Sequence, residues 1–347
     1  MSMPLIYRIV DMKKLYEIFK KQGGVNLIKQ YLLCGTFFTA INQFFVLGKS
    51  RTALEILRLS TSLKAKCKLE KKYKNKIEEL LTKYDVSKNK EKGTNIWFCW
   101  FQGLENAPEI VKVCFLSLNR HIKDKNVVLI TENNYQEYVC FPEFIQEKVD
   151  KGMISKTHLS DLLRLELLLK YGGTWIDATV LCTDDNIPEY MLNSELFMFQ
   201  CLKPGRDGHV TVMSNWFISA YSNNKILFLT RELLYEYWKE KNVVVDYFIF
   251  HIFMQMAIEK CPEEWNKVTP VSNSTPHILL LRLFEKYDGR MWDNIVQQIP
   301  FHKLSYKCLK ESHDTYYDYI INHYGDNGAL GASFASGVKC DEIIKNK

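Results

Sequence analysis

The sequence predicts an α/β fold with a mixed, mainly parallel sheet, preceded by an N-terminal helical subdomain. Residues 95–101 and 126–131 are short runs of β-forming residues, and residues 108–120 between them have helical spacing of their apolar positions. A strand, a helix and a second strand in this order indicate a parallel pair joined by a right-handed crossover. The first 92 residues lack strand alternation and space their apolar residues three and four apart, which predicts helices.

Residues 1–92 form the first of three predicted parts, and their most apolar stretch covers residues 31–47. It reads YLLCGTFFTAINQFFVL and is interrupted by Gly35, Asn42 and Gln43. A membrane-spanning helix needs about 20 apolar residues, so we do not predict a span. A buried helix of the subdomain and a surface that meets lipid remain open as interpretations.

The net charge of +6 is concentrated in the segment that follows. Residues 62–93 hold eleven Lys and five acidic residues, a surplus of six, so the rest of the chain balances to zero. Anionic lipid attracts such a cluster by about 1 kcal/mol per basic residue, whereas a solvated helix face is the simpler explanation. Peripheral membrane contact, contact with a partner and packing on the core therefore stay open for this part. The localised charge disfavours a nucleic-acid-binding surface.

Composition and cysteine spacing favour an intracellular globular protein. Hydrophobic residues make up 47% and charged residues 25% of the chain, as in ordinary soluble domains. The ten cysteines include no C-x-x-C pair, which disfavours a structural zinc site. The opening MSMPLIYRIVDMKK lacks the pattern of a secretory signal. We therefore expect a cytoplasmic protein with reduced thiols, either free or peripheral on the inner face of the membrane.

The second predicted part, residues 93–193, contains the stretch that carries the chemistry. From Thr157 it reads THLSDLLRLELLLKYGGTWIDAT. A helix is predicted from His158 to Tyr171, with Thr157 or Ser160 as its N-cap and Gly172 at its end. A short apolar strand follows the two glycines.

Two charged pairs lie on this helix. Asp161 and Arg164 are three apart and share one face, while Glu166 and Lys170 are four apart on another face. Glu166 and Lys170 attract each other and are expected to face solvent, so this pair needs no further explanation. The first pair lies on a leucine-rich helix, where buried charges must be matched. It is either an internal ion pair or a pair that grips a polar ligand, and its spacing alone favours neither.

The strand after the glycines ends at Asp177. Ligands of parallel sheets gather at the carboxyl ends of the strands. A carboxylate at such a position is costly unless it is paired or binds a cation or ligand. Asp177 is therefore the third candidate site residue.

The third predicted part, residues 194–347, mixes a strand at 196–200 with helices near 225–240, 247–259 and 278–287. Such a region usually supplies the acceptor side of a two-part α/β enzyme. We expect it to complete the domain begun by the second part.

The string SDLLRLELLLKYGGTWID, which ends at Asp177, resembles the sugar-binding region of retaining glycosyltransferases with the Rossmann-like GT-A fold. These include capsular polysaccharide synthesis proteins, which match best, the yeast mannosyltransferase type and the catalytic domains of clostridial toxins. The resemblance covers about Asn95–Asp185, extends more weakly to Tyr324 and leaves residues 1–90 unexplained. It implies transfer of a hexose from a UDP-sugar to a lipid-linked or growing oligosaccharide of a bacterial surface polysaccharide, with retention of configuration.

The resemblance also implies roles for individual residues. Asp161 would hold sugar hydroxyls, Arg164 would reach the sugar or the diphosphate, and Asp177 would be the first acid of an Asp-x-Asp motif. Trp100 matches the aromatic residue that stacks on uracil, a contact worth about 1–3 kcal/mol per base. Core packing is the alternative for both strand tryptophans, and Trp97 is expected in the core because it lies on the other side of the strand.

The triplet Asp177-Ala178-Thr179 departs from the pattern, because Thr179 stands where the family has a second acid. In the family that acid helps to bind Mn²⁺ or Mg²⁺ against the diphosphate, and a neutral hydroxyl is a poor ligand for a hard cation. Three outcomes are open: weak metal binding at Asp177 and Thr179 completed by other residues, metal-independent catalysis by basic groups, or lost activity. We expect weak metal use.

Two later segments resemble the family more loosely. The segment that begins at Asp246 resembles an acceptor-facing segment, which implies acceptor-side roles for Asp246 and His251; a structural histidine is the alternative. The segment HKLSYK resembles one near the diphosphate. Lys303 and Lys307 would then neutralise the departing nucleotide, with exposed lysines as the alternative.

Two rival functions compete with this prediction. The first is a catalytically weak or inactive nucleotide-sugar or glycan-binding subunit of a polysaccharide assembly complex, in which Thr179 abolishes turnover. The second is a sugar-phosphate transferase, which the lysines would serve but no motif demands. Release of UDP from a UDP-sugar panel separates catalysis from binding.

Overall fold

A mixed sheet with helices on both faces lies at the centre of the structure. The computed structural model describes residues 24–48, 50–203, 208–307 and 313–325. The strands are β1 (Asn95–Cys99), β2 (Asn126–Ile130), β3 (Gly173–Asp177), β4 (Val180–Cys182), β5 (Leu196–Gln200), β6 (Met213–Ala220) and β7 (Phe301–Lys303). The helices are α2 (Gly24–Cys34), α3 (Phe37–Leu47), α4 (Arg51–Lys83), α5 (Glu109–His121), α6 (Tyr135–Tyr138), α7 (Glu143–Asp150), α8 (Lys156–Tyr171), α9 (Glu189–Asn193), α10 (Lys225–Glu240), α11 (Ile249–Lys260), α12 (Pro262–Trp265), α13 (Ile278–Arg282), α14 (Gly289–Val296) and α15 (Tyr316–Tyr324), with a 3₁₀ turn at Thr275–His277.

The main sheet has the strand order β2-β1-β3-β6-β5 in the described part of the chain. β1 pairs in parallel with β2 and β3, whereas β6 runs antiparallel to both β3 and β5. In this sheet only β6 therefore opposes the common direction, and the predicted α/β fold with a mixed, mainly parallel sheet is confirmed. The register places Cys99 beside Asp177, so β1 and β3 end at the same edge.

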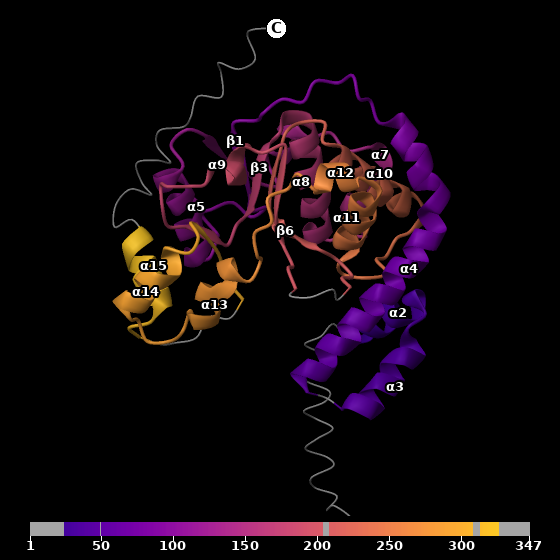
Figure 1. Cartoon of the computed structure of the whole chain (residues 1–347), viewed down its shortest axis with the longest axis horizontal. Helices are drawn as coiled ribbons and strands as arrows, with labels where there is room; N and C mark the ends of the chain where they lie inside the picture. The colour runs from indigo at the N-terminus through magenta and orange to yellow at the C-terminus, as the bar shows by residue number, and fades with distance from the viewer. Residues whose placement is uncertain (1–23, 49, 204–207, 308–312, 326–347) are drawn as a thin grey trace, which may run out of the picture.

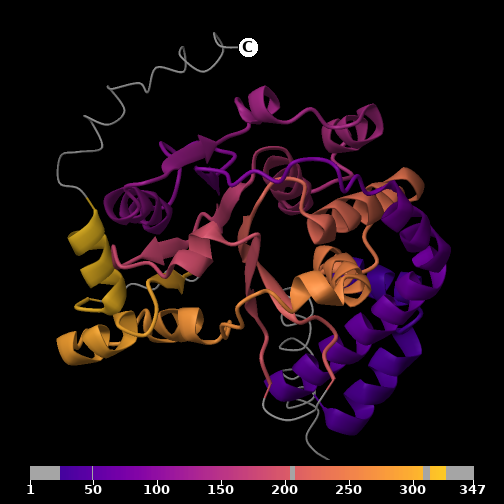
Figure 2. The ribbon, with the colours of Figure 1, turned by 45° about the horizontal axis from the view of Figure 1, so that its top comes forward.

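Alternation along the strands sends neighbouring side chains into two different cores. Trp97 and Trp175 pack on one face with residues of α8, α10 and α11. Phe98 and Ile176 pack on the other face with residues of α5, α14 and α15. Figure 2 shows the C-terminal helices and the α10–α11 pair on either side of the central strands. The expected core position of Trp97 is confirmed, since its side chain is fully buried.

The long helix α4 connects this sheet to an N-terminal helical hairpin. The side chain of its N-cap, Ser50, accepts a hydrogen bond from the first turn. In its second half Leu69, Tyr73, Ile77 and Leu80 are buried in the same core as α10 and α11. Its first half packs on α2 and α3, which project away from the sheet (Figure 1). The second half of α4 is therefore part of the central fold, and only the hairpin end stands apart.

The projecting hairpin exposes a large apolar surface. Phe38, Phe45 and Val46 of α3 are 83%, 78% and 72% exposed. We call this surface the hairpin patch; its other exposed members are Leu32, Leu33, Ile41, Phe44, Leu47, Ile56, Leu59 and Leu63. None of the helices in the described residues combines the length and the hydropathy that crossing a bilayer requires.

Two local predictions are wrong. The N-cap of α8 is neither Thr157 nor Ser160 but Ser155, whose extended backbone lets its hydroxyl accept a hydrogen bond from the first turn. The helix predicted over residues 278–287 ends at Arg282, because the chain then turns to pair with the segment that precedes α15.

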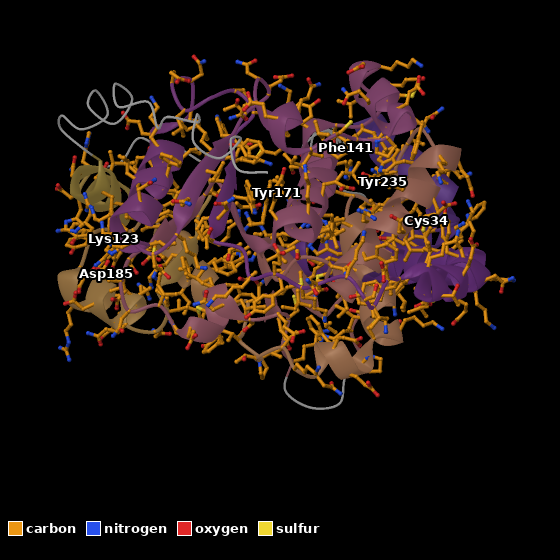
Figure 3. All side chains as sticks on the ribbon, turned by 90° about the horizontal axis from the view of Figure 1, so that it is seen from above. Cys34, Lys123, Phe141, Tyr171, Asp185 and Tyr235 are labelled. Carbon is orange, nitrogen blue, oxygen red and sulfur yellow. The ribbon has the colours of Figure 1, made fainter. Side chains whose placement is uncertain are left out.

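The predicted pair between Glu166 and Lys170 is also replaced by other contacts. Glu166 accepts hydrogen bonds from the Tyr235 hydroxyl at 2.6 Å and from Arg231 Nη1 at 3.4 Å. Lys170 donates to the carbonyl of Tyr138 at 3.1 Å. The reason is that α10 packs on this face of α8, so Glu166 faces a second helix instead of water; Tyr235 is labelled in Figure 3.

Candidate functional site

Helix α8 carries a buried ion pair on the face that meets the sheet. Asp161 and Arg164 are only 6% and 4% exposed. Arg164 Nη2 lies 3.2 Å from Asp161 Oδ1, so the three-residue spacing does place the two groups in contact. The side-chain amide of Asn215 on β6 donates to the same Asp161 oxygen at 3.0 Å, and the backbone carbonyl of Asn215 accepts a hydrogen bond from Arg164. The pair is thus held by both its helix and the sheet.

A tight turn brings Asp177 to this pair. Gly172 and Gly173 both have positive φ, at 64° and 94°, a conformation that favours glycine. A Cβ on Gly173 would also lie 2.3 Å from the carbonyl oxygen of Asn95. The turn therefore needs glycine both for its backbone angles and for the close approach of β1, and it leads β3 directly to Asp177.

Asp177 meets Arg164 at the end of β3. Its Oδ1 lies 3.7 Å from Arg164 Nη2 and accepts a hydrogen bond from Trp175 Nε1 at 3.0 Å. The Arg164 guanidinium stacks over the Trp175 ring at 4.8 Å. One guanidinium therefore links the helix carboxylate and the strand-end carboxylate, and an aromatic ring fixes its orientation.

Lys303 reaches the same carboxylate from a distant part of the chain. Its Nζ donates to Asp177 Oδ2 and to Thr179 Oγ1, both at 2.9 Å. The contact depends on the two-stranded sheet β4–β7, in which Val180 pairs with Lys303. The amide of Leu304 also donates to the carbonyl of Thr179 at 2.7 Å. This short sheet holds the lysine against the Asp177-Ala178-Thr179 triplet.

These four residues, Asp161, Arg164, Asp177 and Lys303, form what we call the strand-end cluster. Burial alone would raise the pKa of Asp177, but Lys303 and Arg164 outweigh it and hold that pKa below its ordinary value. Arg164 thus pairs with both carboxylates, and Lys303 pairs with Asp177. The side chains of Asp177 and Lys303 are 28% and 18% exposed, so this cluster opens to solvent at the strand end.

His251 on α11 belongs to the same surroundings. Burial lowers its pKa to about 4, Asp161 and Asp177 oppose this shift, and Arg164 adds to it. Its Nδ1 is buried without a hydrogen-bond partner among the described residues. The imidazole is therefore neutral at physiological pH, and its Nδ1 keeps an unused hydrogen-bonding position.

Trp100 follows β1 at the same edge of the sheet. It comes directly after Cys99, whose register partner is Asp177, and its ring meets Tyr306 edge to face at 5.3 Å. The side chain is half-buried, and within the described residues its Nε1 has no hydrogen-bond partner. Trp97 by contrast donates to the carbonyl of Gly172 at 2.9 Å inside the core. The two strand tryptophans therefore lie in different environments.

Two of the residues expected at the site are placed differently. Asp246 precedes α11, and its carboxylate accepts hydrogen bonds from the Ser62 hydroxyl of α4 at 2.8 Å and from the amide of Phe248 at 2.7 Å. Lys307 is exposed, and its ammonium lies 5.8 Å from the centre of the Tyr306 ring. Asp246 thus joins α4 to the loop before α11.

The residues present do not fit the Mn²⁺ or Mg²⁺ that the resemblance implies at Asp177 and Thr179. Lys303 already bonds both side chains, and Thr179 replaces the second acid of the motif, so a metal ion between them would meet an ammonium and a single carboxylate. Within the residues that the structure describes, no three His, Cys, Asp or Glu side chains are grouped to hold a metal ion. A hard cation prefers charged oxygen ligands, which this arrangement does not offer in surplus.

Three residues that contact the strand-end cluster or Trp100 were not predicted from the sequence: Asn215, Trp175 and Tyr306. Asn215 and Tyr306 lie far along the chain from the residues they touch, and nothing in their local sequence marks them. Trp175 could have been found, because alternation places it on the same side of β3 as Asp177.

A family model described as "Capsular polysaccharide synthesis protein" matches residues 53–320. The O-glycosyltransferase braB of Annulohypoxylon truncatum is 29% identical over 177 residues, which cover 46% of this chain and 40% of that protein. The O-glycosyltransferase PaGT of Phomopsis amygdali is 23% identical over 163 residues, which cover 43% and 39%. The chain therefore spans about two fifths of the length of these two relatives.

Among solved structures, the PaToxG glycosyltransferase aligns with 75% of this chain and 94% of that chain. The sequence identity is 13% and the TM-score is 0.35.

Proposed function

Because the chain belongs to the capsular polysaccharide synthesis protein family, we propose that it is a glycosyltransferase. Its donor would be a UDP-sugar, and its acceptor a lipid-linked or growing oligosaccharide of a bacterial surface polysaccharide. The names of its relatives, O-glycosyltransferases over the matched segments, support the reaction class. Retention of the anomeric configuration is part of the proposal and follows the resemblance described above.

The observation that carries the proposal is the convergence of the strand-end cluster. Asp161, Arg164 and Asp177 come from a helix and a strand, and they meet where β1 and β3 end. Buried ionic groups of this kind weaken a fold unless they are fully paired or serve a ligand. Partial exposure of Asp177 and Lys303 gives a ligand access to the cluster.

Each member of the cluster has a proposed role in sugar transfer. Asp161 and Asp177 would accept hydrogen bonds from sugar hydroxyls and favour oxocarbenium character at the anomeric carbon. Arg164 would orient Asp177 and reach the sugar or the diphosphate, and Lys303 would face the diphosphate. The barrier lies in breaking the bond between the anomeric carbon and the leaving oxygen, so positive charge beside the departing UDP lowers it. We propose that the acceptor hydroxyl oxygen attacks the anomeric carbon on the face from which UDP leaves, so that the new glycosidic bond forms as the bond to UDP breaks, and that the hydroxyl proton passes to the departing phosphate oxygen.

Two aromatic groups extend the proposed site. Trp100 would stack on the uracil ring, since it lies one residue beyond the strand position that pairs with Asp177. His251 would donate or accept a hydrogen bond with the acceptor hydroxyl, because its ring is neutral and its Nδ1 lacks a partner in the described residues. Lys307 would add charge near the diphosphate only if its side chain moves from Tyr306.

The hairpin patch supports a proposed contact with an anionic membrane surface. Apolar side chains such as Phe38 and Phe45 are exposed on it. Residues 24–68 contain seven basic residues and one acidic residue, Glu55. Exposed aromatics beside net positive charge bind at the interface of anionic bilayers. A cytoplasmic enzyme bound peripherally in this way would meet a lipid-linked acceptor at the membrane.

Sedimentation with lipid vesicles tests this contact. The protein should sediment with vesicles of phosphatidylcholine and phosphatidylglycerol, and much less with pure phosphatidylcholine. The double change Phe38→Glu and Phe45→Glu should abolish binding. Val86→Glu is the matched control, since Val86 is 84% exposed outside the patch. Equal sedimentation of all three proteins would contradict the contact.

The central experiment measures binding and turnover together. Calorimetry with UDP tests the nucleotide site, and released UDP is measured with a panel of UDP-sugars, with and without acceptor and Mn²⁺. Turnover of one donor supports the transferase. Binding without any turnover would favour the rival glycan-assembly binding subunit, and the absence of both would defeat the donor assignment.

A further inference from the structure

We infer that the Lys303 ammonium takes the place of the divalent cation in this site, so that donor binding and departure of the nucleotide need no Mn²⁺ or Mg²⁺. The inference rests on the proposed function for the identity of the donor. It concerns the cation alone, however, and it is carried by contacts that do not depend on which sugar is transferred.

Lys303 occupies the position between Asp177 and Thr179. Lys303 Nζ bonds Asp177 Oδ2 and Thr179 Oγ1 at 2.9 Å each. These are the first and third residues of the triplet that the family motif uses for its metal. The ammonium therefore bridges the two side chains between which a metal ion would have to bind.

The charge balance of the strand-end cluster also disfavours a divalent cation. In the strand-end cluster two carboxylates, Asp161 and Asp177, are already balanced by Arg164 and Lys303. Sites for hard divalent cations depend on charged oxygen ligands, and Thr179 supplies only a neutral one. A divalent cation beside Lys303 would meet a like charge, whereas a phosphate oxygen can accept the remaining N–H donor of the ammonium.

The backbone around Lys303 is held in place. Its neighbours on β7, Phe301 and His302, are fully buried. The pairing of β7 with β4 and the bond from the Leu304 amide to Thr179 fix the backbone on both sides of Lys303. Solvated surface lysines have no such support, so this ammonium is a preorganised charge, which is what electrostatic catalysis requires.

The geometry also leaves the lysine able to act. An ammonium has three N–H donors, and the described residues accept two of them. The third donor is available to a phosphate oxygen, and the side chain is 18% exposed. When the bond to the anomeric carbon breaks, the electron pair goes to the β-phosphate oxygen of UDP. Lys303 would stabilise the charge that develops there without transferring a proton.

Metal binding without nucleotide gives the most direct test. Electron paramagnetic resonance should find no stoichiometric Mn²⁺ on the wild-type protein. The double change Thr179→Asp and Lys303→Ala restores the second acid and removes the ammonium, so it should create a Mn²⁺ site. Stoichiometric Mn²⁺ on the wild type that is lost in Asp177→Asn would overturn the inference. This readout needs no activity and is unaffected by an error in the proposed donor.

Nucleotide binding gives the second test. Calorimetry should give the same UDP affinity in EDTA and in Mn²⁺. Lys303→Ala should weaken it by roughly tenfold or more, as loss of a charged hydrogen bond does, and Lys303→Arg should recover part of the loss. Lys123→Ala is the charge control, since Lys123 precedes the amino end of β2, whereas the strand-end cluster lies at the carboxyl ends of the parallel strands β1 and β3.

The outcomes separate the two ideas. UDP binding that requires Mn²⁺ would overturn the inference and leave the proposed function standing. Failure to bind UDP under any condition, together with the expected Mn²⁺ results, would remove the proposed function and keep the lysine in the cation position. Circular dichroism and thermal melting of each variant show whether a loss reflects misfolding.

Discussion

Helix α8 takes part in two ionic clusters that look alike in the sequence and differ in the fold. The strand-end cluster draws its members from α8, β3 and β7, and Asn215 of β6 supports it. The second, which we call the helix cluster, joins Glu166 of α8 to Arg231, Glu232 and Tyr235 of α10. One gathers groups from across the chain at a strand end, and the other fastens two helices.

The difference is the one we expect between an ion pair that holds the fold and one that serves a ligand. Both oxygens of Glu166 have partners on α10, and burial together with Glu166 raises the pKa of Tyr235, so its hydroxyl stays protonated and donates. The helix cluster is complete without a ligand. The strand-end cluster instead keeps a spare donor on Lys303, and beside it His251 Nδ1 lacks a partner in the described part of the chain. We expect substitutions to affect stability in one cluster and function in the other.

The largest effect is expected at Asp177. Asp177→Asn removes the negative charge that Lys303 and Arg164 hold ionised and that we propose faces the sugar, so kcat should fall by roughly 10²–10³-fold, as when one electrostatic stabiliser is lost. Released UDP measures the rate, and thermal melting should show a folded protein. Unchanged turnover would return the strand-end cluster to a structural role.

The next effect concerns pH and His251. Because its pKa falls from 6.5 to about 4 in the fold, the neutral ring is favoured, and stability is complete above pH 6.5. As pH falls from 6.5 to 4 the unfolded chain takes up the proton first, which removes up to about 3 kcal/mol. Urea unfolding at several pH values measures this slope.

His251→Gln should flatten the slope, whereas Tyr235→Phe should keep it, since the helix cluster contains no histidine. His302 shares the lowered pKa of about 4, so part of the slope should survive in His251→Gln. A slope that His251→Gln leaves unchanged would show that this ring does not titrate with folding.

A smaller effect is expected for Trp100. Trp100→Ala removes the proposed stacking surface and should weaken UDP binding by about 1–3 kcal/mol, which calorimetry measures as a raised Kd. The melting temperature of the Trp100→Ala variant should change little because the Trp100 ring is only half-buried. A normal Kd combined with a lowered melting temperature would assign Trp100 to the core.

The smallest effect is expected in the helix cluster. Tyr235→Phe deletes the hydroxyl that bonds Glu166 and should lower the free energy of unfolding by about 1 kcal/mol, because Arg231 still pairs with the carboxylate. Urea unfolding measures the loss, and UDP affinity should stay at the wild-type value. A weakened UDP affinity would mean that the two clusters communicate through α8.

The sequence predicted those features that are local. The Asp161–Arg164 contact, the end of α8 at Gly172 and the position of Asp177 at a strand end all follow from short spacings and from the conformational freedom of glycine. The strand alternation likewise separated Trp97 from Trp100. These are properties that a few neighbouring residues determine together.

The remaining features depend on long-range packing, which short patterns do not encode. Glu166 was expected to pair with Lys170, but α10 supplied better partners. Lys303 was recognised as a candidate, yet its bond to Asp177 spans 126 positions and depends on the β4–β7 pairing. Only the pairing of β4 with β7 reveals that the Lys303 ammonium lies between Asp177 and Thr179.

The β4–β7 pairing also has a consequence for biosynthesis. Asp161, Arg164 and Asp177 emerge from the ribosome long before Lys303, so the growing chain carries an unbalanced carboxylate until β7 arrives and pairs beside Thr179. A nascent or prematurely terminated product that lacks β7 would hold all five strands of the main sheet but would lack the Lys303 ammonium that pairs with Asp177 at its edge. Non-local pairings of this kind form late. The sheet can therefore fold before the proposed site is complete, and translation of the segment that contains β7 supplies its last member.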